Sequence, residues 1–332
     1  MSPGPVQRPA RDIPLRGFGT FQADNAAYPP GTAKAATLEA LKVGYRHIDT
    51  AYAYGNGQVE REVGEAIRES GIPRDEIFVV TKLHNTFHNP ADVETGLDFS
   101  LKNLQLDYVD LFLMHNPYAY VKGPGFSTLR RPDGSGRPLI DVPMSRRYPE
   151  TWQAMAKLVA KHKTRHIGLS NFNILKIKRV IEETGIVPLA NQVEMNPYFP
   201  QYELLEFCKA NGIQVIAHCP LGGALARTVS KRIGGGPLED PIIRSIAAAH
   251  GNKTPAQIIL AWLTGRKICV VPKSANASRI RSNFDMLFPL TEAENAQIAG
   301  LMGPRGERCV RNLSNENHIG FDVFDEQVDQ PV

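Results

Sequence analysis

Residues 44–56 read GYRHIDTAYAYGN, and they combine a short strand with a loop of chemically active side chains. Tyr45, His47 and Asp49 alternate with a period of two, which is typical of a strand. Gly55 and Asn56 end this pattern, and an amphipathic helix is predicted over residues 58–69. A carboxylate at a strand end, a phenol in the following loop and then a helix are the arrangement in which barrel enzymes carry their catalytic groups.

The alternation of strand and helix continues along the chain. Uninterrupted apolar runs such as residues 77–81 (IFVVT) indicate strands buried on both faces. The predicted strands cover residues 15–21, 47–49, 77–81, 108–114, 166–169, 189–193, 213–217 and 268–271. The predicted helices cover residues 32–43, 58–69, 89–104, 150–161, 173–183, 201–211, 241–250, 255–263 and 277–286. Eight strands, each followed by a helix, predict an α/β protein with the (β/α)8 TIM barrel fold rather than a doubly wound sheet.

One domain is expected over residues 1–332, with the barrel core at 13–302, because the same rhythm runs from end to end. Residues 89–90 (NP) are expected to begin the third helix, since proline is favoured at a first helical position. Residues 116–148, rich in Pro, Gly and Arg, interrupt the rhythm as a long irregular segment. A loop of that length in a compact domain is more often a functional lid than a linker. Residues 303–332 are expected to form a C-terminal tail.

Composition excludes several classes of protein. The formal net charge is only +4, from 38 basic and 34 acidic residues, so the chain lacks the electrostatic footprint of a nucleic-acid binder. The four cysteines are widely spaced, without a CxxC pair or a histidine at zinc-ligand spacing, and no metal is expected. The first residues lack the apolar core of a secretory signal, and no later stretch resembles a membrane span. A cytoplasmic protein without a membrane or nucleic-acid partner is expected, as a monomer or a weak homodimer.

Four polar side chains stand at or just beyond the ends of three consecutive predicted strands. They are Asp49, Tyr54, Lys82 and His115. Each taken singly is more often structural, as a helix cap, a packing residue or a solvated charge. Because the carboxyl ends of barrel strands surround one mouth, the four are expected to meet there.

The chemistry follows from the residue types. A tyrosine titrates near 10 in isolation, so a neighbouring ammonium is expected to lower the pKa of Tyr54, with Asp49 holding Lys82 in place. The phenol would then protonate a developing alkoxide. A neutral His115 could orient a carbonyl oxygen and donate a hydrogen bond to it.

Several sequence blocks in the same order resemble the aldo-keto reductase family over residues 14–301. The blocks are GYRHIDTA (44–51), VTKL (80–83), LMHNP (113–117), IGLSNF (167–172), NQVE (191–194) and VPKS (271–274). The resemblance implies a nicotinamide cofactor across the barrel mouth, reversible hydride transfer to an aldehyde or ketone, and Tyr54 as the proton donor. It also implies that Ser170, Asn171 and Gln192 hold the carboxamide of the nicotinamide.

Further cofactor contacts are implied by the same resemblance at Thr20, Asp49, His218, Cys219 and Leu221. The adenosine end is assigned to Lys273, Ser274, Asn276, Arg279 and Asn283. Lys273 and Arg279 supply two cations where a 2′-phosphate would lie, so NADPH is expected rather than NADH. The glycines at 234–236 are assigned to a flap over the pyrophosphate.

The chain departs from the family at positions that face the ligands. His218 stands where many relatives have a tyrosine beneath the nicotinamide, so weaker and pH-dependent cofactor binding is expected. Phe21, His84 and Asn116 occupy places where relatives often have tryptophans. These residues, with Tyr54 and His115, are the expected substrate contacts.

The lid segment is rich in cations, which favours a hydroxylated or anionic carbonyl substrate such as a sugar-derived aldehyde or a uronate. The cations are Lys122, Arg130, Arg131, Arg137, Arg146 and Arg147. Charge runs of this kind more commonly face water.

Two alternative functions belong to other classes than an NADPH-dependent carbonyl reductase. A non-catalytic NADPH-binding regulatory subunit of the same fold is disfavoured, because the four catalytic residue types are complete. A metal-dependent barrel hydrolase is disfavoured by the lack of an HxH pair or a carboxylate cluster at the strand ends.

Overall fold

A barrel of parallel strands forms the centre of the computed structural model, which describes residues 12–21, 29–223, 235–251 and 253–303. The strands are β1 (Gly17–Gly19), β2 (His47–Asp49), β3 (Phe78–Leu83), β4 (Val109–Met114), β7 (Thr164–Ser170), β8 (Ala190–Glu194), β9 (Gln214–His218) and β10 (Cys269–Val270). They pair in the order β1-β2-β3-β4-β7-β8-β9-β10. The backbone N–H of Val270 donates to the carbonyl of Leu15 at 2.9 Å, which brings β10 back to β1. The predicted (β/α)8 barrel is confirmed.

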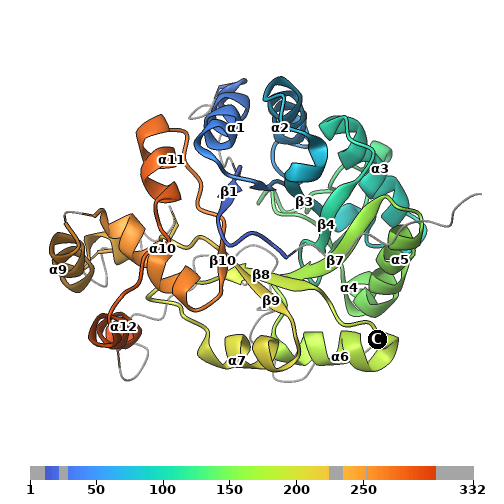
Figure 1. Ribbon diagram of the computed structural model, residues 1–332. Helices are drawn as coiled ribbons and strands as arrows, with labels where there is room; N and C mark the ends of the chain where they lie inside the picture. Colours follow the sequence, from blue (N-terminus) through green and yellow to red (C-terminus); the bar gives the residue numbers. More distant parts are fainter. Residues whose placement is uncertain (1–11, 22–28, 224–234, 252, 304–332) are drawn as a thin grey trace, which may run out of the picture.

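Helices surround the strands (Figure 1). They are α1 (Thr32–Val43), α2 (Gln58–Glu69), α3 (Val93–Leu104), α4 (Val142–Arg146), α5 (Tyr148–Ala160), α6 (Ile174–Thr184), α7 (Tyr202–Ala210), α9 (Pro241–Ala249), α10 (Pro255–Gly265), α11 (Ala277–Phe284) and α12 (Glu292–Ala299). Short 3₁₀ turns occupy Arg74–Glu76, Asn85–Phe87, Pro124–Phe126, Pro237–Glu239 and Gly300–Met302. Side-chain caps begin several helices, as at α6, where Asn173 Oδ1 accepts from the N–H of Lys176 at 2.9 Å.

The expected start of the third helix is wrong. Asn89 Oδ1 accepts a hydrogen bond from the N–H of Ala91 at 3.0 Å, so residues 89–91 form a turn that precedes the helix. Helix α3 begins at Val93.

The sequence predicted that residues 116–148, the lid segment, would be irregular. The structure shows instead that this segment contains a small sheet of its own. β5 (Ala119–Tyr120) pairs antiparallel with β6 (Ile140–Asp141), and α4 follows directly. Asp141 begins α4 by accepting from the N–H of Met144 at 3.0 Å. The ring of Phe126 stacks on that of Phe87, with centroids 4.6 Å apart, so the lid packs against the β3–α3 loop.

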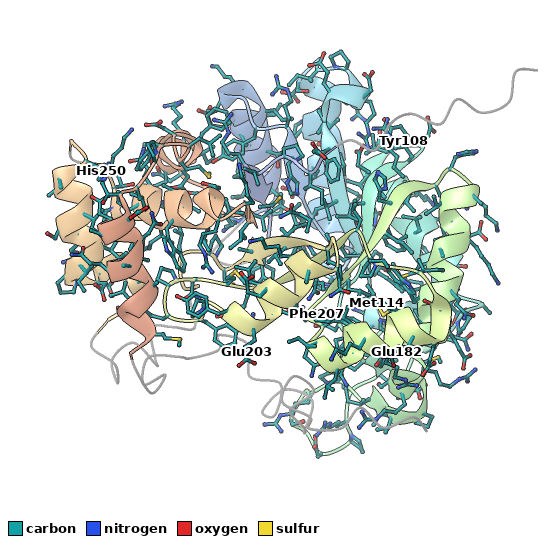
Figure 2. All side chains as sticks on the ribbon, turned by 60° about the horizontal axis from the view of Figure 1, so that its bottom comes forward. Tyr108, Met114, Glu182, Glu203, Phe207 and His250 are labelled. Carbon is teal, nitrogen blue, oxygen red and sulfur yellow. The ribbon has the colours of Figure 1, made fainter. Side chains whose placement is uncertain are left out.

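Helix α12 was not predicted from sequence, and it lies beside α9 at one edge of the molecule (Figure 1). His250, at the end of α9, connects the two, because its Nε2 lies 2.9 Å from Glu294 Oε1. Side chains fill the space between the strands and the helices, and His250 lies at the periphery, far from Met114 near the centre (Figure 2).

The period-two pattern of the strands sorts side chains into two cores. Phe78 and Val80 of β3 join the cluster inside the barrel, whereas Val79 and Leu83 join the larger cluster between strands and helices. Lys82 shares the parity of Phe78 and Val80, so it points into the barrel. Contrary to expectation, Lys82 lies within β3 rather than beyond its end.

The segment before β1 covers the end of the barrel at which the strands begin. Ile13 is buried and joins the inner cluster with Phe78 and Cys269. The carbonyl of Pro14 lies 3.0 Å from Nδ1 of His47, which fixes the segment to β2. The expected tail falls outside the described residues from 304 onward. Of the glycines assigned to the flap, Gly234 also lies outside the described residues, whereas the N–H of Gly236 donates to Glu239 Oε2 at 2.8 Å.

Candidate active site

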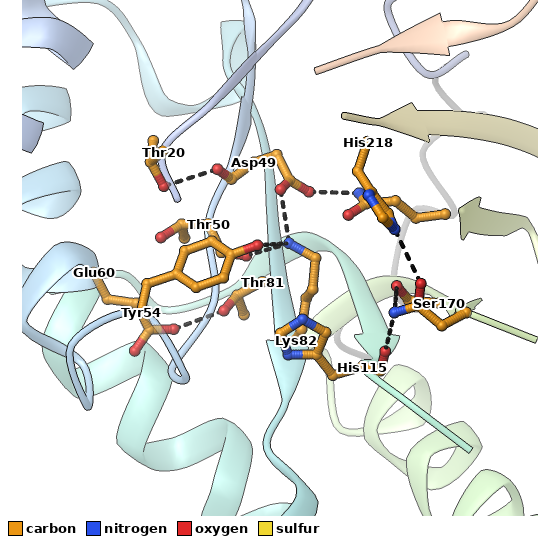
Figure 3. Close-up of polar contacts among 12 residues, drawn as sticks. Thr20, Asp49, Thr50, Tyr54, Glu60, Thr81, Lys82, His115, Ser170 and His218 are labelled. Carbon is orange, nitrogen blue, oxygen red and sulfur yellow. Dashed lines mark hydrogen bonds and ion pairs between the residues drawn. The ribbon is translucent and has the colours of Figure 1, made fainter. Parts of the chain in front are cut away.

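The predicted site residues meet because of strand parity. On β2 the outward residue is Ile48, so Asp49 points inward, and on β4 the inward Leu111 and Leu113 place His115 on the inner side. The same alternation turns Ser170 on β7, Gln192 on β8 and His218 on β9 inward, because their outward neighbours Leu169, Val193 and Ala217 belong to the outer core. Asp49, Ser170 and His218 are the last residues of their strands, His115 directly follows β4, and Gln192 lies in the middle of β8. The sequence therefore brings them to one mouth (Figure 3).

The ammonium of Lys82 lies at the centre of the cluster. Its Nζ donates to Asp49 Oδ1 at 2.7 Å, to the carbonyl of Thr50 at 2.9 Å and to the hydroxyl of Tyr54 at 3.2 Å. The residue is only 1% exposed. Burial lowers the pKa of Lys82, but Asp49 and Tyr54 outweigh it and the net pKa is raised. Lys82 is therefore a buried cation with all three donors used.

Tyr54 differs from expectation in the direction of its pKa shift. Burial raises the pKa of Tyr54 above the ordinary value of a phenol, and the charge of Lys82 offsets this only in part. The prediction of a lowered pKa is wrong for this structure. Desolvation of the phenolate exceeds its attraction to Lys82, because Asp49 neutralises much of that charge. The phenol is protonated at neutral pH.

His115 faces Tyr54 across the mouth, with ring centroids 6.0 Å apart. Burial, followed by the charge of Lys82, lowers the pKa of His115 well below its usual range. The imidazole is therefore neutral, as expected from sequence, and one ring nitrogen carries a proton that it can donate.

Asp49 connects this cluster to the residues assigned to the nicotinamide. Its Oδ2 accepts from Gln192 Nε2 at 2.7 Å, and its carbonyl accepts from the hydroxyl of Thr20 at 2.9 Å. Asn171 donates through Nδ2 to Ser170 Oγ at 3.2 Å and accepts at Oδ1 from His218 Nε2 at 3.0 Å. Ser170, Asn171, Gln192 and His218 thus form a hydrogen-bonded arc beside Lys82.

His218 does not titrate as expected. Burial, with a further contribution from Lys82, lowers the pKa of His218 to about 4. The imidazole is neutral from pH 5.5 to 8 in this structure, so titration of His218 does not support the expected pH dependence of cofactor binding in that range. The weaker cofactor binding stays a prediction. Cys219 follows with a left-handed backbone (φ 48°), and its carbonyl accepts from the N–H of Gly222 at 2.9 Å. Leu221 is partly buried against the outer core.

The residues assigned to the adenosine end lie together between β10 and α11. Asn276 Oδ1 accepts from the N–H of Arg279 at 3.0 Å and so begins α11. Ser274 Oγ accepts from Arg279 Nε at 3.3 Å. The backbone of Lys273 forms an isolated parallel β-bridge with Gly19 of β1. Asn283 is buried on α11.

The expected substrate contacts lie in different settings. Phe21 is 53% exposed, and its ring centroid lies 5.1 Å from that of Tyr54. His84 is buried, with Nδ1 2.9 Å from Thr86 Oγ1 and its ring against Tyr120. Asn116 donates to Asn85 Oδ1 at 3.3 Å and accepts from Asn171 at 3.2 Å.

Two contacts of the site were missed by sequence reasoning. The carbonyl of Thr50 accepts from Lys82, and a backbone acceptor has no residue signature. The carboxylate of Glu60 binds the hydroxyl of Thr81, next to Lys82, at 2.6 Å. Glu60 lies on an amphipathic helix, where a glutamate is ordinarily assigned to the solvent face.

Within the described ranges, every helix is too short or too polar to span a membrane. No group of three or more His, Cys, Asp or Glu side chains in these ranges could hold a metal ion.

A closed barrel with a buried lysine, an aspartate, a phenol and a neutral imidazole at the carboxyl ends of its strands defines a class, the barrel oxidoreductases. Comparison with known proteins specifies the family. The family model for the aldo/keto reductase family matches residues 17–302. Aldo-keto reductase family 1 member A1 from Mus musculus is 42% identical over 300 residues, which is 87% of this chain and 86% of that protein. The Xenopus tropicalis protein of the same name is 44% identical over 296 residues, or 87% and 85% of the two chains.

Solved structures agree with the sequence comparison. The aldose reductase from Schistosoma japonicum superimposes with a TM-score of 0.81 at 35% identity, over 96% of this chain and 97% of that chain. An aldo/keto reductase from Brucella melitensis gives a TM-score of 0.70 at 38% identity, over 87% and 95%. The chain belongs to the aldo-keto reductase family. As a member, it is an oxidoreductase of the NADP-dependent, carbonyl-reducing class.

Proposed function

We propose that this protein reduces an aldehyde or ketone to an alcohol with NADPH, and that Tyr54 is the general acid. The observation that carries the proposal is the position of the Tyr54 hydroxyl, 3.2 Å from the buried ammonium of Lys82. Asp49, at 2.7 Å from the same ammonium, holds it in place. An acid beside a fixed cation suits a reaction in which an oxygen gains negative charge.

The raised pKa of Tyr54 is compatible with this role. The acid must be protonated when the carbonyl binds, and burial keeps the phenol so at neutral pH. An alkoxide is far more basic than a phenolate, so proton transfer from Tyr54 to the developing alkoxide is favourable. The phenolate left on Tyr54 is then stabilised by Lys82.

His115 orients the carbonyl in the proposed mechanism. Its imidazole is neutral and its ring lies beside that of Tyr54. A ring N–H can donate to the carbonyl oxygen while Tyr54 donates to the same atom. Two fixed donors stabilise the transition state more than the uncharged ground state, because charge accumulates on that oxygen only during the reaction.

The arc of polar side chains fits the cofactor. When bound, the nicotinamide supplies the hydride. A carboxamide offers both donors and an acceptor, and Ser170, Asn171 and Gln192 offer the complementary groups. Thr20, Asp49, His218, Cys219 and Leu221 would flank the ring and its ribose. Ser274, Asn276 and Asn283 would hold the adenosine, and Lys273 and Arg279 would favour NADPH through charge-assisted hydrogen bonds to the 2′-phosphate.

We infer a polar substrate, either hydroxylated or anionic, such as a sugar-derived aldehyde or a uronate. Among the lid cations, Lys122 pairs with Asp92 and Arg147 pairs with Glu150. Arg130 is exposed and its guanidinium donates to the carbonyl of Gly136 at 3.1 Å, and its charge adds to the effect of burial in lowering the pKa of His84. Arg130 is therefore the lid cation that we assign to an anionic substrate group.

Turnover assays test the proposal. The purified protein should consume NADPH in the presence of a sugar-derived aldehyde, a uronate and a plain aromatic aldehyde, with the highest kcat/KM for the polar compounds. Binding of NADPH without turnover of any carbonyl would instead support the alternative, a regulatory subunit of the same fold. A preference for the aromatic aldehyde would reject the substrate class but retain the reaction.

A further inference from the structure

A carboxylate that the proposed mechanism does not use lies directly behind the active site. Glu60, in the first turn of α2, has a relative exposure of 0%. Its Oε1 accepts from the hydroxyl of Thr81 at 2.6 Å, and its Oε2 accepts from Asn103 Nδ2 at 3.0 Å. No Lys or Arg of the described ranges forms an ion pair with it. Burial of a carboxylate without a cation is unfavourable, and these two hydrogen bonds offset only part of that cost.

Glu60 connects the same two segments that the catalytic pair connects. Thr81 and Lys82 are neighbours on β3 and point to opposite faces, Thr81 outward and Lys82 inward. On the other segment, Tyr54 lies in the loop before α2 and Glu60 lies in the first turn of that helix. Glu60 therefore holds the outer face of β3 while Tyr54 meets the inner face at Lys82 (Figure 3).

The loop between Tyr54 and Glu60 packs against the residue that binds Glu60. Gly55, Asn56 and Gly57 all have left-handed backbones, with φ of 62°, 51° and 83°. Glycine adopts this region freely and asparagine more readily than other residues, so the loop turns sharply into α2. A Cβ on Gly57 would lie 2.2 Å from Asn103 Nδ2, so the amide that binds Glu60 also packs directly against the loop.

We propose that Glu60 is a positioning residue, which sets the distance between the Tyr54 hydroxyl and the Lys82 ammonium by fastening the start of α2 to Thr81. The proposal rests on the proposed role of Tyr54 as acid. A carboxylate suits the position because it has two acceptor oxygens for two donors on different elements, Thr81 on β3 and Asn103 on α3.

Loss of this fastening has a specific chemical consequence. A longer separation weakens the stabilisation of the phenolate by Lys82, so the pKa of Tyr54 rises further. Oxidation of the alcohol needs the Tyr54 phenolate as base. In a variant with a higher pKa of Tyr54, the oxidation rate should therefore begin to rise at a higher pH than in the unaltered protein. The other charges that act on Tyr54 come from Asp49 and Cys219, and those that act on Glu60 come chiefly from Lys82. None of the variants below changes these groups.

Thr81→Val is the sharpest test, because it deletes the hydroxyl with little change of shape. The matched control is Thr264→Val, which deletes a buried hydroxyl that donates to the carbonyl of Leu260 at 2.9 Å on α10, away from the mouth. Thr81→Val and Glu60→Ala should lower kcat for carbonyl reduction about fivefold or more. They should also shift the rising limb of alcohol oxidation upward by about half a pH unit. KM for the carbonyl and Kd for NADPH should change less than about twofold.

The conservative variant adds a rescue. Glu60→Gln keeps an oxygen for Thr81 and should lie closer to the unaltered protein than Glu60→Ala in both kcat and pH profile. If Glu60→Ala does not fold, Thr81→Val and Glu60→Gln decide. Suppose that Thr81→Val and Glu60→Ala lose stability as Thr264→Val does but keep the kcat of the unaltered protein and the same rising limb in the pH profile of alcohol oxidation. That result would overturn the positioning role of Glu60. Full activity of Tyr54→Phe would instead overturn the proposed acid, so the two failures are distinguishable.

Discussion

Oδ1 of Asp49 lies 2.7 Å from Nζ of Lys82, and the two residues are 3% and 1% exposed. The other carboxylate oxygen accepts from Gln192 on the far side of the barrel. One buried carboxylate thus joins the acid cluster to the arc assigned to the nicotinamide, so changes at Asp49 act on stability and chemistry together.

Asp49→Asn should destabilise the fold by about 3 kcal/mol, because it leaves the Lys82 ammonium buried without its counter-charge. The double variant Asp49→Asn/Lys82→Met should be less destabilised than the sum of the single variants, since it removes the unpaired cation. Urea unfolding followed by circular dichroism measures all three. An Asp49→Asn protein within about 0.5 kcal/mol of the unaltered one would show that the pair is not needed to hold the cation.

Lys273→Met and Arg279→Met should each raise KM for NADPH about tenfold, because each removes a charge-assisted hydrogen bond to the 2′-phosphate. KM for NADH should stay the same, since NADH lacks that phosphate. Arg281→Met is the matched control, because Arg281 is on the same helix but pairs with Glu39 at 2.7 Å. Equal increases for both cofactors would contradict the assignment of these cations.

Cofactor binding should not depend on titration of His218 between pH 5.5 and 8, because burial lowers its pKa to about 4. The 2′-phosphate of NADPH titrates itself, so the informative quantity is the ratio of Kd values for the unaltered protein and His218→Tyr. That ratio should stay constant across the range, with tighter binding by the larger ring. A ratio that changes with a midpoint near pH 6.5 would mean that His218 titrates normally.

Acid should destabilise the protein through its buried histidines. Burial lowers the pKa of His84 and His218 to about 4 and that of His88 to about 3. The unfolded chain, with an ordinary pKa near 6.5, takes up protons that the folded chain does not, so stability falls as pH drops below 6.5. At pH 5 each histidine should contribute a loss of about 2 kcal/mol.

Urea unfolding of His88→Leu between pH 7 and 5 checks this expectation. The variant should lose less stability over that interval than the unaltered protein, by up to about 2 kcal/mol. The exposed His162→Asn is the control and should keep the original pH dependence. Identical slopes for all three proteins would show that His88 is not held neutral by the fold.

The sequence predicted the fold and the meeting of the site residues because both follow from local periodicity. Apolar runs and period-two alternation mark strands, and parity then turns Asp49, Lys82 and His115 to one mouth. The small lid sheet was missed because β5 and β6 have two residues each, too few for a period. The raised pKa of Tyr54 was missed because it depends on a balance of burial against Lys82 that residue types do not determine. Glu60 was missed because its partner Thr81 is defined only by packing.

The rate of carbonyl reduction by Tyr54→Phe, at saturating NADPH and substrate, tests the role of Tyr54 as acid most directly. Phenylalanine keeps the ring against Phe21 and His115 but removes the hydroxyl that Lys82 contacts. We expect a fall in kcat of about a hundredfold or more, with Kd for NADPH unchanged. A Tyr54→Phe protein that reduces carbonyls as fast as the unaltered enzyme would contradict that role.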